Sequence, residues 1–401
     1  RNKKPTMPKV LRILNRLIIG GPLLNAAYLT KYLSPEFETL LVVGQKEAHE
    51  KEADFVTEEL GIKPLYFPQM SRAIHPLKDY TAIRKMKSII RDFQPDIVHT
   101  HAAKPGLIGR MAASSLKVPV IVHTFHGHVF HSYFNSVKTK LILQTERYLA
   151  KKSSAIIAIS DLQKKELAET YKIAPEEKFR VVPLGLDLDK FSKNYEQKRK
   201  SFRDEFALSD DTIAIAIIGR LVPVKNHTLF LEAIQYVLNN TNRKIKAFIV
   251  GDGETRPMLE AKAKELGIPF TGEKDKTHPL VFTSWRKDVD VINAGVDIIA
   301  LTSFNEGTPV SLIEAQAANN PIVSTAVGGI GDVVPEGKSG LLSPLDDPQK
   351  FYDNLLTLVT DDQLRNELSQ QGHAFVIEQF SYQTLMKNMR NLYYELLSKH
   401  S

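Results

Sequence analysis

Four charged side chains in the second half of the chain could bind a phosphate-bearing ligand. Glu306 and Glu314 stand eight positions apart in the stretch SFNEGTPVSLIEA, and Arg220 and Lys225 stand five apart in IIGRLVPVKN. Arginine offers a planar fork of donors and lysine a point charge, so the two cations could hold a diphosphate. A carboxylate accepts two hydroxyls at once, which suits a sugar diol such as ribose. The competing interpretation is that these are ordinary surface charges.

The residues between the two glutamates predict a helix whose start faces the ligand. The apolar run VDIIAL (296–301) precedes them and is typical of a buried strand. Pro309 suits the first turn of a helix, where a missing N–H costs nothing, and Thr308 could cap that turn. Free N–H groups at a helix start favour phosphate. Glu306 would then lie before the helix and Glu314 about two turns into it.

Glycine turns follow other apolar runs and could let the backbone approach the same ligand. Gly20 and Gly21 lie in IIGGPLLN, Gly251 lies in VGDGETRPMLE, and a further turn is AVGGIGDVVPEGKSG. GxG alone is a poor phosphate motif, so a tight strand-to-helix turn is the simpler interpretation of the second stretch.

Histidines recur in VHTFHGHVF, at positions 123, 126 and 128. This spacing invites a metal site, but no acidic or sulfur ligand is clustered with them, and alternate residues of a strand point to opposite faces. We therefore predict no metal there. We expect His126, which precedes a glycine, to reach the ligand, while the histidines of HTHAAKPG (99–106) could pack or cap.

The elements that must position these residues follow a regular alternation. Short runs rich in Val and Ile alternate with longer amphipathic segments, which predicts an α/β fold with parallel sheets covered on both faces. A chain of 401 residues exceeds the length at which one core usually splits. Because the polar segment 187–210 interrupts the alternation, we expect two Rossmann-like domains, 1–187 and 188–382. Ligands of such sheets bind outside the carboxyl ends of the strands.

The composition, 43% apolar and 25% charged, is that of a soluble globular protein. No apolar run approaches the roughly 20 residues of a membrane span, and we read the basic start and LRILNRLIIGG as a first strand rather than a signal peptide. The lack of cysteine excludes thiolate metal sites and is compatible with the cytoplasm. The net charge of +7 indicates a lysine-rich solvated surface or an anionic partner. The sequence lacks the stripe of Arg and Lys with interleaved aromatics that would indicate nucleic-acid binding.

Taken together, these motifs resemble those of the retaining nucleotide-sugar glycosyltransferases of family 4, which have the GT-B fold. The resemblance covers most of the chain and is strongest over 217–342. It rests on the order and spacing of IIGGP, FHG, GRLVPVKN, GDGETRPMLE and NEGTPVSLIEA. Many members carry Phe-Gly where this chain has Thr308-Pro309, which keeps the glutamates in place and leaves the donor sugar open.

The resemblance implies roles. Arg220 and Lys225 would hold the donor diphosphate, Glu314 the ribose and Glu306 the transferred sugar, while His126 would lie near that sugar and the acceptor. The implied catalytic set is His126, Glu306, Arg220 and Lys225. The other implied donor contacts are Gly20, Gly21, Gly251, Arg286 at the nucleobase, Gly307, Thr308, Pro309, Val310 and Glu314.

The resemblance also implies that no cofactor or metal is needed, since the cations and the helix start can neutralise the leaving group. Retaining glycosidases use two close carboxylates, but no second carboxylate here suits attack on the anomeric carbon. The resemblance implies front-face transfer instead, with the departing phosphate taking the acceptor proton. Residues 383–401 would pack back on the first domain.

The implied activity is transfer of a hexose or N-acetylhexosamine, from a UDP-sugar or less favoured GDP-sugar, to a glycan or lipid-linked acceptor in bacterial surface polysaccharide or glycoconjugate synthesis. We expect a cytoplasmic protein, with possible contact at the inner face of the plasma membrane. The basic segment 137–152 could dock on anionic lipid, or could be a core helix with a solvated basic face. The rival functions are a non-hydrolysing sugar-nucleotide 2-epimerase and a non-enzymatic two-domain sugar-binding protein.

Overall fold

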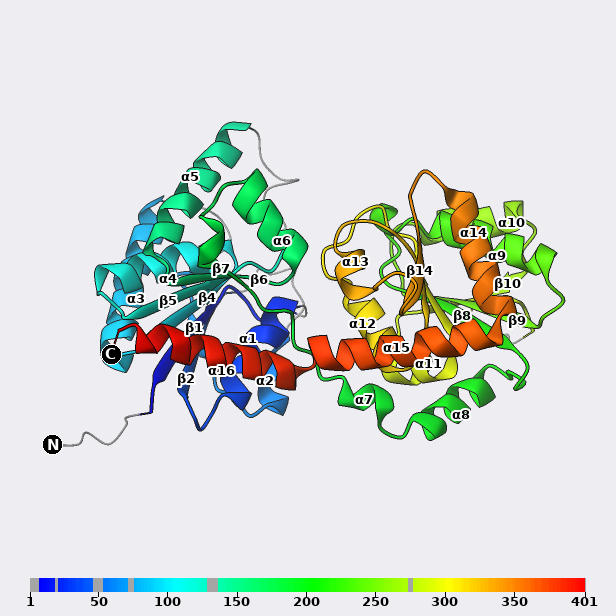
Figure 1. Cartoon of the computed structure of the whole chain (residues 1–401), viewed down its shortest axis with the longest axis horizontal. Coiled ribbons are helices and arrows are strands. Elements are labelled where there is room, and N and C mark those ends of the chain that lie inside the picture. The colour runs from blue at the N-terminus through cyan, green and yellow to red at the C-terminus, as the bar shows by residue number, and fades with distance from the viewer. Residues whose placement is uncertain are drawn as a thin grey trace. The chain divides into compact units, whose positions relative to one another are not determined.

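The computed structural model describes residues 7–18, 21–45, 53–70, 76–127, 136–272 and 277–400. The chain divides into two compact units (Figure 1). The first comprises the residues up to Leu186 together with those from Phe380 on, and the second comprises Asp187–Gln379.

Within the described residues, the first unit has a parallel sheet of seven strands in the order β3-β2-β1-β4-β5-β6-β7. The strands are β1 (Lys9–Leu14), β2 (Glu38–Gly44), β3 (Leu65–Phe67), β4 (Ile97–His101), β5 (Val120–Thr124), β6 (Ala155–Ala158) and β7 (Phe179–Val181). The helices are α1 (Gly21–Tyr32), α2 (Asp54–Glu59), α3 (Pro76–Phe93), α4 (Ala103–Ser115), α5 (Ser136–Lys152), α6 (Asp161–Lys165) and α16 (Tyr382–Ser398).

The second unit repeats this plan, again with seven described parallel strands, in the order β10-β11-β9-β8-β12-β13-β14. The strands are β8 (Ile213–Ile218), β9 (Ile245–Val250), β10 (Phe270–Thr271), β11 (Leu280–Ser284), β12 (Ile298–Leu301), β13 (Ile322–Thr325) and β14 (Gly340–Ser343). The helices are α7 (Asp189–Ser192), α8 (Tyr195–Glu205), α9 (His227–Asn240), α10 (Arg256–Glu265), α11 (Val289–Gly295), α12 (Val310–Ala317), α13 (Ile330–Val333), α14 (Pro348–Thr360) and α15 (Asp362–Phe380). The predicted α/β class with parallel sheets is confirmed.

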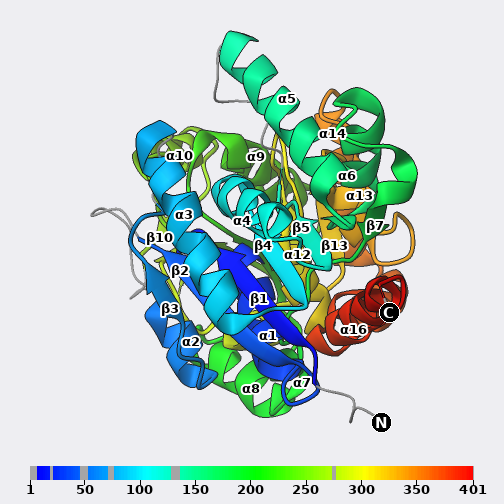
Figure 2. The ribbon, with the colours of Figure 1, turned by 90° about the vertical axis from the view of Figure 1, so that its left-hand side faces the viewer.

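The last helix, α16, belongs to the core of the first unit and lies beside α1 (Figures 1 and 2). Ser381 caps its start by accepting the Thr384 N–H. Its apolar face packs with strand residues such as Val10 and Ile97 in one buried cluster. The Tyr382 ring stacks on Tyr32 with 4.5 Å between ring centroids. The helix is therefore an integral part of this unit.

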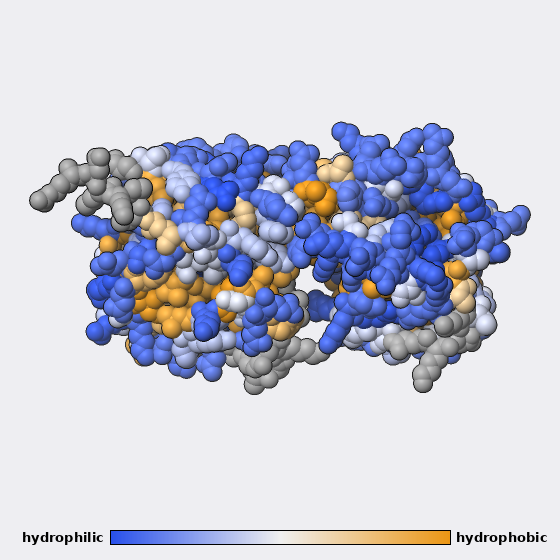
Figure 3. Space-filling view, turned by 90° about the horizontal axis from the view of Figure 1, so that it is seen from below, coloured by the Kyte–Doolittle hydropathy of each residue, from blue (hydrophilic) through white to orange (hydrophobic). Residues whose placement is uncertain are grey.

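Hydrophobic residues gather over part of the surface of the first unit (Figure 3). The exposed apolar side chains of α2 and of the edge strand β3 include Phe55, Leu65 and Tyr66. The shortness of β3, three residues, limits the unpaired edge that it offers to other chains.

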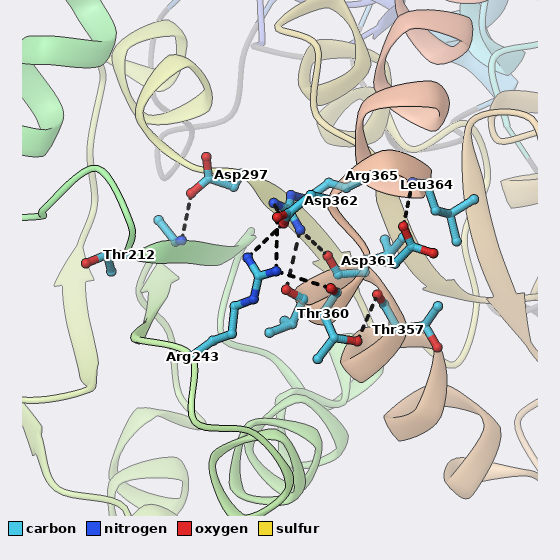
Figure 4. A network of polar contacts seen from close by, with 12 residues as sticks. Thr212, Arg243, Asp297, Thr357, Thr360, Asp361, Asp362, Leu364 and Arg365 are labelled. Atoms are coloured by element: carbon cyan, nitrogen blue, oxygen red, sulfur yellow. Dashed lines mark hydrogen bonds and ion pairs between the residues drawn. The ribbon is translucent and has the colours of Figure 1, made fainter.

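Ion pairs join side chains at the amino-terminal edge of the second sheet (Figure 4). Arg243, just before β9, presents its two terminal nitrogens to the Asp362 carboxylate at 2.8 and 2.9 Å. Arg365 pairs with the same carboxylate, and Asp361 accepts the Leu364 N–H at 2.9 Å. These contacts fix the corner between α14 and α15, so the polar groups of this edge are occupied by one another.

Candidate active site

The carboxyl-terminal edge of the second sheet carries polar loops of a different kind. β8 pairs with β12 where the strand order reverses, since β9 and β11 lie on one side of this pair and β13 on the other. Ligands of open α/β sheets bind outside the strand ends at such a point. The loop after β8 holds Arg220 and Lys225, and the loop after β12 holds Glu306. The two loops that the sequence singled out are thus neighbours.

Lys225 and Glu306 form an ion pair, with Nζ 2.5 Å from Oε1. The Ser303 hydroxyl donates to the same Oε1, and the Thr302 hydroxyl donates to the Lys225 carbonyl at 2.9 Å. The two charged side chains retain only 21% and 11% of their exposure. The predicted residues therefore meet across 81 positions of sequence. Sequence reasoning missed Ser303, whose hydroxyl holds the carboxylate in place.

Two glycines after β13 hold the Glu306 loop. The Gly329 N–H donates to the Glu306 carbonyl at 3.0 Å. Gly328 has a φ of +51°, and a Cβ there would lie 2.0 Å from the same carbonyl oxygen. A Cβ on Gly329 would lie 2.1 Å from the Gly307 carbonyl oxygen. The sequence predicted that this turn approaches a ligand, but its closest approach is to the backbone of the neighbouring loop.

At position 251, close packing against a neighbouring backbone likewise requires a glycine. Its φ is +139°, and a Cβ would lie 1.9 Å from the Gly219 carbonyl oxygen at the end of β8. Its N–H donates to the Ser284 carbonyl at 3.0 Å. This close packing accounts for the glycine, and a contact with a donor stays a prediction.

The start of α12 differs from the prediction. The helix begins at Val310, and Pro309 is its N-cap residue, with ψ at 94° and no side-chain cap. The prediction that Thr308 caps the helix is wrong, and Pro309 precedes the first turn because its extended ψ keeps it outside the helix. An uncapped helix start leaves N–H groups that favour an anion. Gly307, Thr308, Pro309 and Val310 stay predicted donor contacts.

Arg220 and Glu314 are the predicted residues without partners. Arg220 is exposed, Glu314 is partly buried as the fifth residue of α12, and neither side chain bonds to another described residue. Burial raises the pKa of the Glu314 carboxyl, which the Lys190 charge opposes and the Asp290 charge reinforces. Glu314 lies nearer the helix start than the predicted two turns. A partly buried carboxylate lacking a donor is typical of a binding site.

Arg286, the predicted nucleobase contact, is held by two acids. It donates to Glu205 at 2.6 and 3.0 Å and to Asp288 at 2.9 and 2.5 Å, and these bonds raise its pKa, with the bond to Asp288 the largest cause. The guanidinium also lies over the Phe206 ring at 5.7 Å. A base contact would have to compete with both carboxylates. The neighbouring Trp285, 63% exposed, was missed by sequence reasoning.

In the first unit, His126 turns its imidazole inward. Its Nε2 lies 2.8 Å from Nδ1 of His101, and the two rings stack with 5.1 Å between centroids. Burial lowers the pKa of His126 to about 3, so the ring is neutral near pH 7. Gly21 begins α1, whereas Gly20 lies outside the described residues, as does His128. The chemistry predicted for His126 must therefore use an uncharged ring.

The neighbouring histidines form a buried polar layer. His99 bonds to the Tyr393 hydroxyl of α16 at 2.6 Å and to the Thr124 hydroxyl at 2.7 Å. Arg12 is fully buried and donates to the same tyrosine oxygen at 3.1 Å. Burial, and then the Arg12 charge, lower the pKa of His99 well below its usual value. The Tyr393 hydroxyl thus links the buried Arg12 guanidinium to the neutral His99 imidazole.

Helix α5 carries the predicted membrane contacts. Lys140, Lys151 and Lys152 are exposed, as are the apolar Leu141 and Tyr148. Arg147 instead donates to backbone carbonyls at 2.8 and 3.1 Å and serves the fold. The Lys138 side chain lies outside the described part of the chain. Membrane contact stays a prediction.

Among the described residues, no cluster of three or more His, Asp or Glu side chains is arranged to hold a metal ion. Likewise, none of the described helices combines the length and apolar character that crossing a bilayer requires. The metal-free reaction expected from the sequence stays a prediction.

Two family descriptions match the chain: Glycosyltransferase Family 4 over residues 26–190 and Glycosyl transferases group 1 over residues 198–375. A UDP-Gal:alpha-D-GlcNAc-diphosphoundecaprenol alpha-1,3-galactosyltransferase of Escherichia coli is 28% identical over 350 residues, which is 86% of this chain and 88% of that protein. A D-inositol 3-phosphate glycosyltransferase of Nocardioides is 28% identical over 313 residues, 72% of this chain and 66% of its own.

Solved structures share the fold at lower sequence identity. Anabaena HepE in complex with UDP has a TM-score of 0.80 at 18% identity, and the match covers 96% of this chain and 100% of the HepE chain. A glycosyltransferase from Rickettsia africae has a TM-score of 0.78 at 18% identity, covering 98% and 99%.

Proposed function

We propose, on the basis that this chain belongs to glycosyltransferase family 4 and has the two-domain GT-B fold, that it transfers a sugar from a UDP-sugar to a hydroxyl of a lipid-linked glycan. The sugar is a hexose or N-acetylhexosamine. The name of the Escherichia coli relative, with its UDP-Gal donor and diphosphoundecaprenol-linked acceptor, supports both halves of this proposal. The setting is the assembly of a bacterial surface polysaccharide or glycoconjugate.

The observation that carries the proposal is the set of unsatisfied groups in the loop after β8 and on α12. Among the described residues, Arg220 is exposed without a side-chain partner, Glu314 is partly buried without a donor, and the helix start has no side-chain cap. A nucleotide diphosphate offers what each lacks: phosphate oxygens for the arginine and N–H groups, and ribose hydroxyls for the carboxylate. Glu306, held by Lys225, faces the transferred sugar.

The proposed reaction retains the anomeric configuration. The bond from the anomeric carbon to the donor phosphate breaks, and the acceptor oxygen bonds to that carbon on the same face. The departing phosphate takes the acceptor proton. Arg220 and Lys225 stabilise the charge that develops on the phosphate. His126, neutral near pH 7, can exchange a hydrogen bond with the sugar but adds no positive charge.

Calorimetry and thermal shift with UDP, GDP and ADP, without added metal, test the donor assignment. We expect UDP to stabilise the wild type by mass action, and much less the Glu314→Ala variant. Glu336→Ala, an exposed carboxylate before β14, is the matched control and should bind as the wild type does. If no nucleotide binds the wild type, the proposed donor class is wrong.

Product analysis separates transfer from its rival. The wild type, given UDP-sugar and a diphosphate-lipid-linked sugar, should release UDP and extend the lipid, with the anomeric configuration kept. Release of an epimerised UDP-sugar without an acceptor would instead indicate an epimerase.

A further inference from the structure

A cavity of about 500 Å³ opens at the amino-terminal edge of the first sheet, opposite the edge that carries the histidines. Its walls come from the residues before β5, the junction of α5 and β6, the entry to β7 and the end of α16. This volume lies within the range of small-molecule sites. None of the residues that line the cavity has a role in the proposed reaction.

The walls are strongly basic. The described lining residues include four cations, Lys152, Lys178, Arg180 and Lys399, and one carboxylate, Glu177. Lys152 ends α5, Lys178 and Arg180 flank the start of β7, and Lys399 follows α16. Three segments that are distant in sequence thus bring positive charge to one cavity, which favours an anionic ligand.

Hydrogen bonds hold Lys178, Arg180 and Lys399 in place, but the lysines do not use all of their donors. Lys178 donates to the Ser153 carbonyl at 2.7 Å. Lys399 and Arg180 bond to one shared carboxylate oxygen of Glu395, at 2.8 and 3.2 Å. An ammonium has three protons, so Lys178 and Lys399, which each donate one to the bonds above, keep others for a ligand. Donors fixed by the fold lose little freedom on binding, which suits them to a phosphate.

One wall of the cavity is apolar, formed by Val118, Pro119, Ile121 and Leu396. We propose that the cavity binds an organic phosphate, with the phosphate oxygens on Lys152, Lys178, Arg180 and Lys399 and the less polar part against this wall. Such a ligand joins β7 to α16. Its binding therefore stabilises the seat of α16 on the first unit, where Tyr393 bonds to His99 and Arg12.

The test is calorimetry of the full chain with inorganic pyrophosphate and with glucose 1-phosphate. The background is Arg220→Ala with Glu314→Ala, which removes two of the proposed donor contacts. We expect pyrophosphate to bind this background, and adding Lys152→Ala and Lys399→Ala to weaken it by about tenfold or more, because charge-assisted hydrogen bonds are lost. Both lysines are exposed, so their loss should leave the fold intact. The matched control is Lys63→Ala with Lys85→Ala, two exposed lysines of the same unit.

Two sources of phosphate are distinguished by a second arm with vesicles of phosphatidylglycerol or phosphatidylcholine. If the soluble phosphates bind and this binding is lost when Lys152 and Lys399 are replaced, the ligand is a free metabolite. Binding to phosphatidylglycerol alone, lost in the same variant, identifies a lipid headgroup. Equal affinity in the lysine variant and its control, or no binding to the background by either source, overturns the proposal. The cations then serve only the carboxyl ends of α5 and α16.

Discussion

The carboxyl-terminal edges of the two sheets each hold a point where the strand order reverses, but they differ in their electrostatics. In the first unit the residues at the switch between β1 and β4 include fully buried His99 and His101, both neutral. In the second unit the equivalent switch carries the Lys225–Glu306 ion pair and exposed Arg220. Strand order decides where a site can form, and the side chains decide which half meets an anion.

The two units should differ most in how their free energies of unfolding respond to acid. The folded pKa values of the buried first-unit histidines, including His126 at about 3, lie below the unfolded value near 6.5. The unfolded chain therefore binds protons first, and the free energy of unfolding falls as pH drops below about 6.5. Each such histidine contributes about 1.4 kcal/mol per pH unit. In the second unit, the pKa of His227 is lowered to about 4.

Hydrogen exchange of β4 and β5 peptides can be set against the fluorescence of Trp285, the one tryptophan of the sequence, which reports on the second unit. As the pH is lowered, the first-unit amides should lose their protection against exchange at a higher pH than the pH at which the Trp285 fluorescence changes. His101→Gln with His126→Gln should reduce the pH dependence, and His400→Gln, at an exposed position, should not. Unchanged protection of the first unit between pH 7 and 5, relative to the intrinsic exchange rate at each pH, would contradict the assignment of neutral buried imidazoles.

Removing charge from the second unit should abolish most of the activity. Lys225→Ala should lower kcat by about 10² to 10³, because one group that stabilises the leaving phosphate is lost and Glu306 loses its partner. Lys244→Ala, an exposed lysine before β9, is the control and should change kcat little. Activity of Lys225→Ala within twofold of the wild type would remove Lys225 from the site.

A smaller effect is expected when the loop that positions Glu306 is moved. Gly328→Ala should lower kcat by about ten- to a hundredfold, since a Cβ there meets the Glu306 carbonyl and a shift of about 1 Å is enough for such a loss. Gly331→Ala is the matched control, because no atom outside its local backbone lies within 4 Å of its Cβ position. Equal activity of the two variants would show that the Glu306 loop is set by other contacts.

The smallest effect is expected at Thr308. Because its side chain does not cap α12, Thr308→Ala should change the free energy of unfolding by less than about 0.5 kcal/mol. Asp347→Ala should cost about 1 kcal/mol, since Asp347 caps α14 by accepting the Lys350 N–H. Urea unfolding of both variants measures the contrast, and a loss at Thr308 as large as that at Asp347 would restore the capping role.

The sequence predicted the parallel sheets and singled out two strand-end loops, that of Arg220 and Lys225 and that of Glu306, because apolar runs and strand-end loops are local patterns. It could not predict which charges neutralise one another. Arg286 meets Glu205 across 81 positions, and His126 meets His101 across 25. Such contacts depend on register and loop geometry, which no local pattern encodes.

The glycines and the start of α12 show a second limit. The turn at Gly328 was read as an approach to a ligand, yet the same residue type is required by the backbone of the adjacent loop. Thr308 and Pro309 have the residue types of a capped helix start, but the extended backbone of Pro309 moves the first turn to Val310. Residue type identifies the turn, and only the three-dimensional packing tells what the turn serves.

The position of α16 has a consequence for synthesis on the ribosome. The first unit needs Tyr393 and its neighbours to complete a core that begins at Val10, and the Arg12–Tyr393 bond spans 381 positions. The second unit is continuous in sequence and lies between these two parts. The second unit can therefore finish folding first, while the nascent first unit waits with a strip of apolar surface uncovered. Chaperone binding during translation should end when α16 emerges.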